Sequence, residues 1–278
     1  MKTDALERSA PILRVSDLGM RFGGVAALQG IGYDVVPGII QAVIGPNGAG
    51  KTTLFNCISG VLAPSEGSIR FEDRQIQGLA PHRIAELGIS RTFQHVALFK
   101  RMTVLENVML GRHPRTRCGF FSTGFRFPRM RSEETQIRKK ALEHLDFVRL
   151  ADCAELPAGT LPLGKQKILE IARALATEPR LVLIDEPAGG LNMRETEDLG
   201  ELIGRIKGLG ITVMLVEHDM NLIMDISDRI LVLHYGMVLA SGTPEEIKEN
   251  RAVIEAYLGM ENDETADLRK PQKQESGY

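Results

Sequence analysis

A glycine-rich run near the start of the chain reads Gly45-Pro46-Asn47-Gly48-Ala49-Gly50-Lys51-Thr52-Thr53 and fits the pattern G-x-x-x-x-G-K-[ST]. An apolar, strand-like segment (39–44) precedes it, and a helix-compatible segment (52–58) follows it. Glycines at these spacings let the backbone wrap round a phosphate group so that several N–H groups point inward. Lys51 adds a charge for the β- and γ-phosphates, and the Thr52 hydroxyl is placed to ligate Mg²⁺. An ordinary glycine turn is the alternative. The flanking strand and helix favour a phosphate-binding loop, and thus a nucleoside triphosphate site.

Composition places the chain among soluble globular proteins, since 43% of its 278 residues are hydrophobic and 25% are charged. A net charge of −2 gives no overall field that favours nucleic acid. No apolar run approaches the roughly 18 residues of a membrane-spanning helix, and residues 1–8 lack the apolar block of a signal peptide. The three cysteines, Cys57, Cys118 and Cys153, are far apart. We therefore expect reduced thiols in a cytosolic compartment and no structural metal site.

Alternation and apolar runs predict an α/β fold. Segments 12–17, 31–36, 39–44 and 68–71 read as strands, and 80–88 reads as a short helix. Segments 181–184 and 211–216 are almost wholly apolar, as is typical of parallel strands buried on both faces. A hairpin is expected around Tyr235-Gly236. Thr243 and Pro244 then supply an N-cap and a first-turn proline for a helix predicted to run to about Leu258.

The middle of the chain has a different, helical character. Thr103 opens one predicted helix with a capping box, and Ser132 opens another that carries Ile137, Ala141 and Leu145 on one face. We therefore predict a core in two parts, 1–96 and 162–260, with a helical subdomain inserted at 97–161. Residues 261–278 are rich in charge and poor in apolar side chains, which predicts a disordered tail.

A basic, aromatic loop lies inside that helical insertion. Residues 112–131 hold six arginines, four phenylalanines and no acidic residue. Three interpretations stay open: a solvated insertion, contact with anionic lipid head groups beside a membrane partner, or nucleic-acid binding with rings available for stacking.

Polar residues stand at the ends of the two late buried strands, where parallel sheets expose their functional side chains. Asp185 and Glu186 follow segment 181–184; Asp185 could hold Mg²⁺ and Glu186 could polarise the attacking water. Two solvated acids are the alternative. His218, after segment 211–216, is either structural or a switch beside the γ-phosphate. Phe22, ahead of the loop, is either a core residue or a ring that stacks on adenine.

Together with Gln94 and the segment Leu161–Lys165, the order of these residues resembles the ATPase subunits of ABC transporters over roughly residues 11–259. The resemblance implies a P-loop NTPase core, with a RecA-like mixed sheet and an antiparallel β subdomain, plus an inserted α-helical subdomain. It implies ATP and Mg²⁺ as cofactors, with Glu186, His218 and Gln94 as catalytic residues. Gln94 would join Thr52 and Asp185 at the metal.

The segment Leu161–Lys165 is similar to the family's L-S-G-G-Q signature, which serves the ATP of the opposite subunit. Pro162, Leu163 and Lys165 depart from that pattern. Gly164 and the following helix N-terminus remain available for phosphate, and Lys165 could add a favourable charge. Leu191-Asn192 resembles the dimer-contact loop, with asparagine in place of the usual aspartate.

Several further runs are similar to the ATPases of branched-chain amino acid importers, namely 102–108, 185–192, 216–220, 242–247 and 256–259. This resemblance implies a head-to-tail ATPase dimer with an identical or sister subunit, two membrane permeases, and an extracytoplasmic solute-binding protein that acts indirectly. It implies a peripheral position on the cytoplasmic face of the inner (cell) membrane, without nucleic acid. Uptake of urea, an amide or another amino acid, export, and an ABC ATPase that works on nucleic acid are the alternatives.

Overall fold

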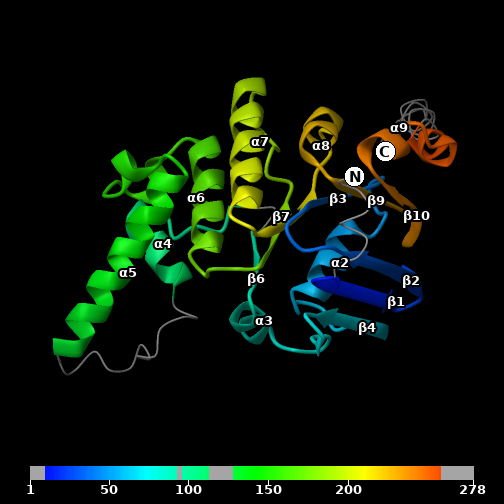
Figure 1. Ribbon diagram of the computed structural model, residues 1–278, viewed down its shortest axis with the longest axis horizontal. Coiled ribbons are helices and arrows are strands. Elements are labelled where there is room, and N and C mark those ends of the chain that lie inside the picture. Colours follow the sequence, from blue (N-terminus) through cyan, green and yellow to red (C-terminus); the bar gives the residue numbers. More distant parts are fainter. Residues whose placement is uncertain (1–9, 93–95, 113–127, 258–278) are drawn as a thin grey trace, which may run out of the picture.

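Two β-sheets and the helices around them form the described part of the chain, residues 10–92, 96–112 and 128–257 of this computed structural model, with side chains in the last range described from 134 (Figure 1). The smaller sheet is antiparallel and has the strand order β2–β1–β4–β5. Its strands are β1 (Leu13–Phe22), β2 (Val25–Val35), β4 (Glu66–Phe71) and β5 (Arg74–Gln75).

The larger sheet has the strand order β10–β9–β3–β8–β7–β6. Its strands are β3 (Ile40–Ile44), β6 (Ile89–Arg91), β7 (Leu181–Asp185), β8 (Thr212–Val216), β9 (Arg229–His234) and β10 (Met237–Gly242). All neighbours pair in parallel except β10, which is antiparallel to β9. The mixed sheet and the separate antiparallel sheet confirm the predicted α/β fold. Because the strands β3, β7 and β8 are parallel, their carboxyl ends meet at one edge of the sheet.

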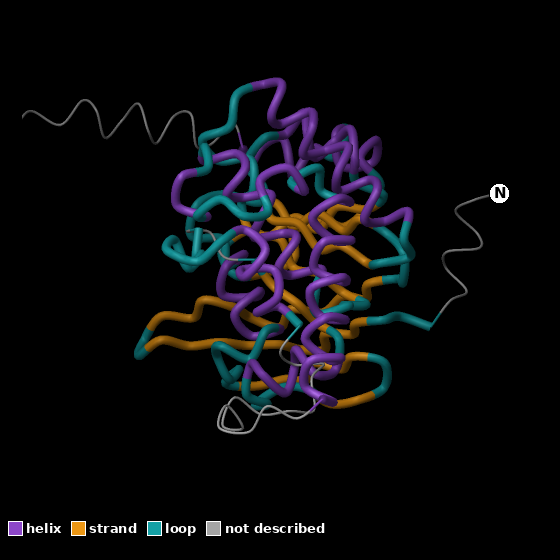
Figure 2. Tube along the Cα trace, turned by 90° about the vertical axis from the view of Figure 1, so that its left-hand side faces the viewer, coloured by secondary structure: helices purple, strands orange, loops and turns teal. Residues whose placement is uncertain are grey.

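The helices connect these strands. They are α2 (Lys51–Ile58), α3 (Pro81–Leu87), α4 (Val104–Gly111), α5 (Pro128–Phe147), α6 (Leu163–Leu175), α7 (Met193–Gly208), α8 (Met220–Ile226) and α9 (Pro244–Lys248), with 3₁₀ turns at Ala151–Cys153 and Ala158–Thr160. Helices α4, α5 and α6 gather at one end of the molecule, opposite the antiparallel sheet (Figure 1). Figure 2 looks onto that end and shows helices in front of the strands. None of the described helices is both long and apolar enough to cross a membrane.

Successive side chains along the strands of the larger sheet point to opposite faces and pack into two different hydrophobic cores, because side chains alternate along a strand. Val182, Ile184 and Leu215 pack with the helices α4 to α7. Leu183 and Val216 point to the other face, where the helix α2 and the antiparallel sheet cover them. A third, smaller cluster joins β3 and β9 to α8, α9 and the end of the described chain. Burial on both faces explains why these strands read as continuous apolar runs.

The predicted helix 243–258 is wrong as a single helix. Helix α9 ends at Lys248, and a second helical segment covers 251–257. Asn250 causes the break, because its side-chain oxygen accepts hydrogen bonds from the backbone N–H groups of Ala252 (3.0 Å) and Val253 (3.3 Å) and so caps a new helix start. The predicted stop at Gly259 lies outside the described residues.

Two other helix predictions need correction. Helix α5 begins at Pro128 and not at Ser132. Proline is suited to the first position of a helix, because an N–H group there has no hydrogen-bond partner within the helix. Helix α8 was absent from the sequence-based prediction; Asp219 opens it by accepting hydrogen bonds from the N–H groups of Asn221 and Leu222. Most of the basic loop and the whole of the tail 261–278 lie outside the described residues, and the division into subdomains stays a prediction.

The capping box at Thr103 is confirmed and carries a testable consequence. The N–H of Glu106 donates to the Thr103 hydroxyl (3.1 Å), and the N–H of Thr103 donates to the Glu106 carboxylate (2.8 Å). Thr103→Ala should therefore lower the free energy of unfolding by about 1 kcal/mol. Urea denaturation measures this. Thr103→Ser, which keeps the hydroxyl, is the matched control, and equal midpoints for the alanine and serine variants would contradict the assignment.

Candidate active site

The glycine-rich loop lies between β3 and α2 and is packed tightly on its inner side. A Cβ atom on Gly45 (φ 147°) would stand 2.1 Å from the carbonyl oxygen of Leu233 in β9. A Cβ atom on Gly50 (φ 102°) would stand 2.8 Å from the carbonyl oxygen of Ala27 in β2. Gly48, in contrast, faces open space. The glycines therefore let the loop lie close against two strands while its rim, which includes Asn47, stays exposed.

Helix α2 presents its N-terminus to this loop without a capping side chain or an acidic residue in its first turn. Lys51, its first residue, is only 6% exposed. Its ammonium group donates to the carbonyl oxygens of Gly45 (2.6 Å) and Pro46 (2.9 Å). Burial lowers the pKa of Lys51, and the nearby carboxylates of Glu186 and Asp185 oppose that shift. Thr52 is exposed and Thr53 half-buried. The N-terminus of α2 and a partly desolvated cation thus meet at one place, which suits an anion.

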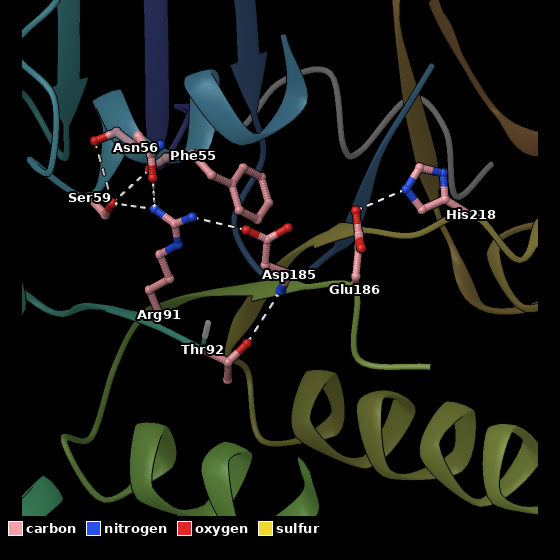
Figure 3. Close-up of polar contacts among 8 residues, drawn as sticks. All are labelled: Phe55, Asn56, Ser59, Arg91, Thr92, Asp185, Glu186 and His218. Atoms are coloured by element: carbon pink, nitrogen blue, oxygen red, sulfur yellow. Dashed lines mark hydrogen bonds and ion pairs between the residues drawn. The ribbon is translucent and has the colours of Figure 1, made fainter. Parts of the chain in front are cut away.

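Asp185 ends β7 and forms a buried ion pair. Its Oδ2 atom lies 2.9 Å from Nη2 of Arg91, with 1% and 8% of the two side chains exposed. The other terminal nitrogen of Arg91 donates to Asn56 (2.6 Å) and Ser59 (2.9 Å), as Figure 3 shows. Thr92 accepts a hydrogen bond from the Asp185 N–H. Burial raises the pKa of Asp185, and the guanidinium of Arg91 opposes that shift.

The second oxygen of Asp185 is the unusual feature of this pair. Its Oδ1 atom is buried and has no hydrogen-bond partner among the described residues. A buried acceptor of this kind costs free energy unless something binds it.

Glu186 and His218 meet at the sheet edge, as the strand ends predict. Their Oε1 and Nε2 atoms lie 2.9 Å apart, and 23% and 48% of the two side chains are exposed (Figure 3). Glu186 has a left-handed backbone (φ 47°), which is rare outside glycine and is held here by a hydrogen bond from its N–H to Val216 O. Adjacent strands therefore supply an acid and an imidazole with partial access to solvent.

Two buried charges that the sequence-based prediction missed hold the loop after Glu186. The ammonium group of Lys167 in α6 donates to the carbonyl oxygens of Glu186 (3.2 Å) and Gly189 (2.5 Å). Glu217 accepts hydrogen bonds from the N–H groups of Ala188 (2.5 Å) and His218 (2.9 Å). Lys167 lies on the same helical face as apolar residues of α6. A charged residue on the apolar face of this helix was the feature of the sequence that could have indicated its role.

The segment Leu161–Lys165 leads into α6, and Pro162 is at its N-cap without a side-chain hydrogen bond. Gly164 is buried, and a Cβ atom there would stand 2.7 Å from the Glu195 carboxylate. Lys165 is exposed. Asn192 caps α7 through a reciprocal pair with Glu195, so its side chain is already engaged within its own helix.

Phe22 ends β1 and is 47% exposed, which argues against the alternative of a core phenylalanine. Gln94 lies outside the described residues.

The chain matches known proteins along most of its length. A family profile described as "ABC transporter" covers residues 28–189, and one described as "Branched-chain amino acid ATP-binding cassette transporter" covers 237–259. The chain is 48% identical to the high-affinity branched-chain amino acid transport ATP-binding protein BraF of Pseudomonas aeruginosa, and 44% identical to LivG of Escherichia coli K12, each over 90% of this chain and 99% of the relative.

Solved structures of ATP-binding cassettes also superpose on the chain. A nucleotide-free ATP-binding cassette from an ABC transporter superposes with a TM-score of 0.78 at 33% identity, covering 89% of this chain and 99% of that one. The ADP conformation of such a cassette also gives 0.78, at 32% identity and with 90% and 100% covered. The chain therefore belongs to the ABC transporter family, as one of its ATP-binding subunits of the branched-chain amino acid type. It is an ATPase.

The side chains present fit a Mg²⁺ ion that is shared with a nucleotide. Within residues 10–92, 96–112 and 128–257, no group of three or more His, Cys, Asp or Glu could hold a metal ion alone. The unpartnered Oδ1 atom of Asp185 and the exposed hydroxyl of Thr52 are hard oxygen donors near the phosphate loop. Mg²⁺ commonly takes one or two protein oxygens and completes its shell with phosphates and water.

Proposed function

We propose that the chain is the ATP-hydrolysing subunit of an importer for branched-chain amino acids, peripheral on the cytoplasmic face of the cell membrane. The observation that carries the ATPase half of this proposal is the pair Glu186–His218, 2.9 Å apart, at the same sheet edge as the phosphate loop. The import half rests on BraF and LivG, whose names describe branched-chain amino acid transport, and on the match at residues 237–259.

The working unit is a head-to-tail dimer with an identical or sister subunit. Each ATP lies between the phosphate loop of one subunit and the signature segment of the other. The N-terminus of α6 supports this role because it has no capping side chain and carries Gly164, so its N–H groups can bind phosphate. Lys165 adds an exposed charge there, and Leu191-Asn192 contacts the partner. Pro162 and Leu163 contribute no hydroxyl, so backbone groups carry the binding.

Hydrolysis uses side chains from three strand ends. Glu186 orients the attacking water and accepts its proton, while His218 holds Glu186 in place and faces the γ-phosphate. Thr52, Asp185 and Gln94 would hold Mg²⁺, which neutralises developing charge on the phosphates. Lys51 binds the β- and γ-phosphates, together with the backbone of residues 45–53. The half-exposed ring of Phe22 stacks on adenine.

The remaining partners are membrane proteins. Two permease subunits form the path for the solute, and a solute-binding protein outside the membrane delivers it to them. The helical subdomain at 97–161 is inserted between the two parts of the core. It transmits the closing motion of the dimer to the permeases. The solute path does not run through this subunit, so urea, an amide or another amino acid remains an alternative cargo.

Affinity purification from native membranes tests the whole proposal. The bait is the chain with Glu186→Gln in the presence of ATP and Mg²⁺. Two multi-span permeases and an ATPase partner, identified by mass spectrometry, are the expected result, and the cognate solute-binding protein then identifies the solute. Recovery with ribosomes or DNA and without a membrane subunit would overturn the transport assignment.

Lys167 provides a prediction for the loop that carries Glu186. Lys167→Met removes the donor that fixes the carbonyl oxygens of Glu186 and Gly189, so we expect the turnover number to fall by roughly 10-fold or more, as expected when a catalytic group is misplaced. The affinity for ATP should stay the same, because the hydrogen bonds of Lys167 go to the loop after Glu186. Lys167→Arg, which can donate to the same oxygens, should restore part of the rate; a methionine variant with normal turnover would contradict this role.

A further inference from the structure

We propose that Arg91 is a positioning residue for Mg²⁺: it occupies one oxygen of Asp185 and thereby directs the other oxygen to the metal. This inference rests on the proposed role of Asp185 as a Mg²⁺ ligand. Arg91 itself touches neither the metal nor the nucleotide in this proposal. Its effect passes through the carboxylate that it holds.

The two carboxylate oxygens of Asp185 have different surroundings. Oδ2 of Asp185 lies 2.9 Å from Nη2 of Arg91. Oδ1 is buried and has no hydrogen-bond partner among the described residues. A carboxylate whose one oxygen is fixed by a charged donor cannot turn freely about its last bond. The acceptor left over therefore has a fixed direction, as a metal ligand needs.

Arg91 is itself held in place by the helix α2. Its Nη1 atom donates to Oδ1 of Asn56 (2.6 Å) and to Oγ of Ser59 (2.9 Å), both in or just after the last turn of α2 (Figure 3). The guanidinium carbon lies 5.8 Å from the centre of the Phe55 ring in the same helix. The hydroxyl of Ser59 is itself oriented, because it donates to the carbonyl oxygen of Phe55 (2.7 Å).

Helix α2 also connects Arg91 to the phosphate loop. The first residues of this helix are Lys51 and Thr52, which belong to the phosphate loop. Arg91 thus ties the end of β7, which carries Asp185, to the helix that carries Thr52. A single guanidinium therefore fixes the relative positions of the elements that carry Thr52 and Asp185, two of the three residues proposed to hold Mg²⁺. Arginine suits this position because its planar group presents several donors in fixed directions and stays charged, whereas the ammonium of lysine is a point charge.

The experiment separates metal binding from nucleotide binding. ATP affinity is measured by calorimetry in EDTA, and Mn²⁺ affinity for the protein–ATP complex is measured by electron paramagnetic resonance. Arg91→Met should leave the ATP affinity in EDTA unchanged and weaken Mn²⁺ binding by roughly 10–100-fold, the usual effect of losing an outer partner of a metal ligand. Arg91→Lys should recover only part of the loss. Arg83→Met, which removes an exposed arginine paired with Glu86, should change neither affinity.

Two further variants make the result decisive. Asn56→Ala with Ser59→Ala removes the anchor and keeps Arg91, and we expect a smaller loss of Mn²⁺ affinity in the same direction; it also serves if Arg91→Met does not fold. Asp185→Asn tests the underlying assignment. If Asp185→Asn does not weaken Mn²⁺ binding, the proposed role of Asp185 is wrong. If it does, but Arg91→Met has normal or higher Mn²⁺ affinity, only the inference about Arg91 is overturned.

Discussion

Glu186→Gln is expected to lower the rate of ATP hydrolysis by about 10²–10⁴-fold, the usual contribution of a general base. The amide has nearly the same size as the carboxylate but cannot accept a proton from water. ATP binding should remain, because the phosphate loop and Lys51 are unchanged. The neighbouring His218 can still contact the side-chain oxygen of glutamine, so the local geometry should persist.

The same variant should accumulate as an ATP-bound dimer, because in the proposed head-to-tail dimer ATP binding closes the two subunits and hydrolysis opens them. Steady-state phosphate release measures the rate, and size-exclusion chromatography with ATP and Mg²⁺ measures the dimer. Glu197→Gln, an exposed acid in α7, is the control and should hydrolyse ATP normally. Normal hydrolysis by Glu186→Gln would show that another group takes the proton.

The parts of the site that were predictable from sequence are those encoded by neighbouring residues. The phosphate loop is a contiguous pattern, so its glycines, Lys51 and Thr52 could be named directly. Asp185, Glu186 and His218 could be predicted as candidates because parallel strands buried on both faces read as apolar runs. Such strands bring their carboxyl ends to one edge of the sheet. The fold class places the ends of β7 and β8 side by side at this edge. The proximity of Glu186 and His218 could therefore be expected from the sequence.

The parts that escaped prediction depend on contacts between distant segments. Arg91 pairs with Asp185 across 94 positions of sequence, and with Asn56 across 35. Nothing in segment 89–94 marks an arginine that will be buried. Lys167 likewise donates to carbonyl oxygens of a loop that follows another strand. Buried ion pairs follow no local period, because burial of a charge is decided by where its partner lies.

Competition between a side chain and the backbone for the same N–H groups explains why the helix predicted over 243–258 is broken. The residues after Thr243 favour a helix start, and nothing in the apolar pattern signals a stop before Leu258. Asn250 nevertheless ends the first helix, because its short side chain can bond to the backbone N–H groups that begin the next one. Asparagine is an unremarkable residue within a helical pattern, and its capping role depends on the geometry of the following turn.

Lys51→Met is expected to weaken ATP binding by roughly 100-fold or more, since hydrogen bonds from a charged group are worth about 1.5–3 kcal/mol each and we propose that the ammonium binds the β- and γ-phosphates. Methionine keeps the unbranched apolar stem that α2 buries. The measurement is thermal unfolding with and without nucleotide. ATP at 100 times its Kd stabilises the wild-type protein by about 2.7 kcal/mol, and the variant should gain little at the same concentration. Lys140→Met, an exposed lysine in α5, should respond to ATP as the wild type does.

Comparison with Asp185→Asn tells which group binds phosphate and which binds metal. Lys51 donates to the carbonyl oxygens of Gly45 and Pro46 in the described structure, and its ammonium must turn from these oxygens to the nucleotide. That exchange needs no metal, so Lys51→Met should lose ATP binding equally in EDTA and in Mg²⁺. Asp185→Asn should lose only the part that depends on Mg²⁺. A Lys51→Met protein that ATP still stabilises in EDTA would mean that the backbone of the loop, without the lysine, carries the affinity for phosphate.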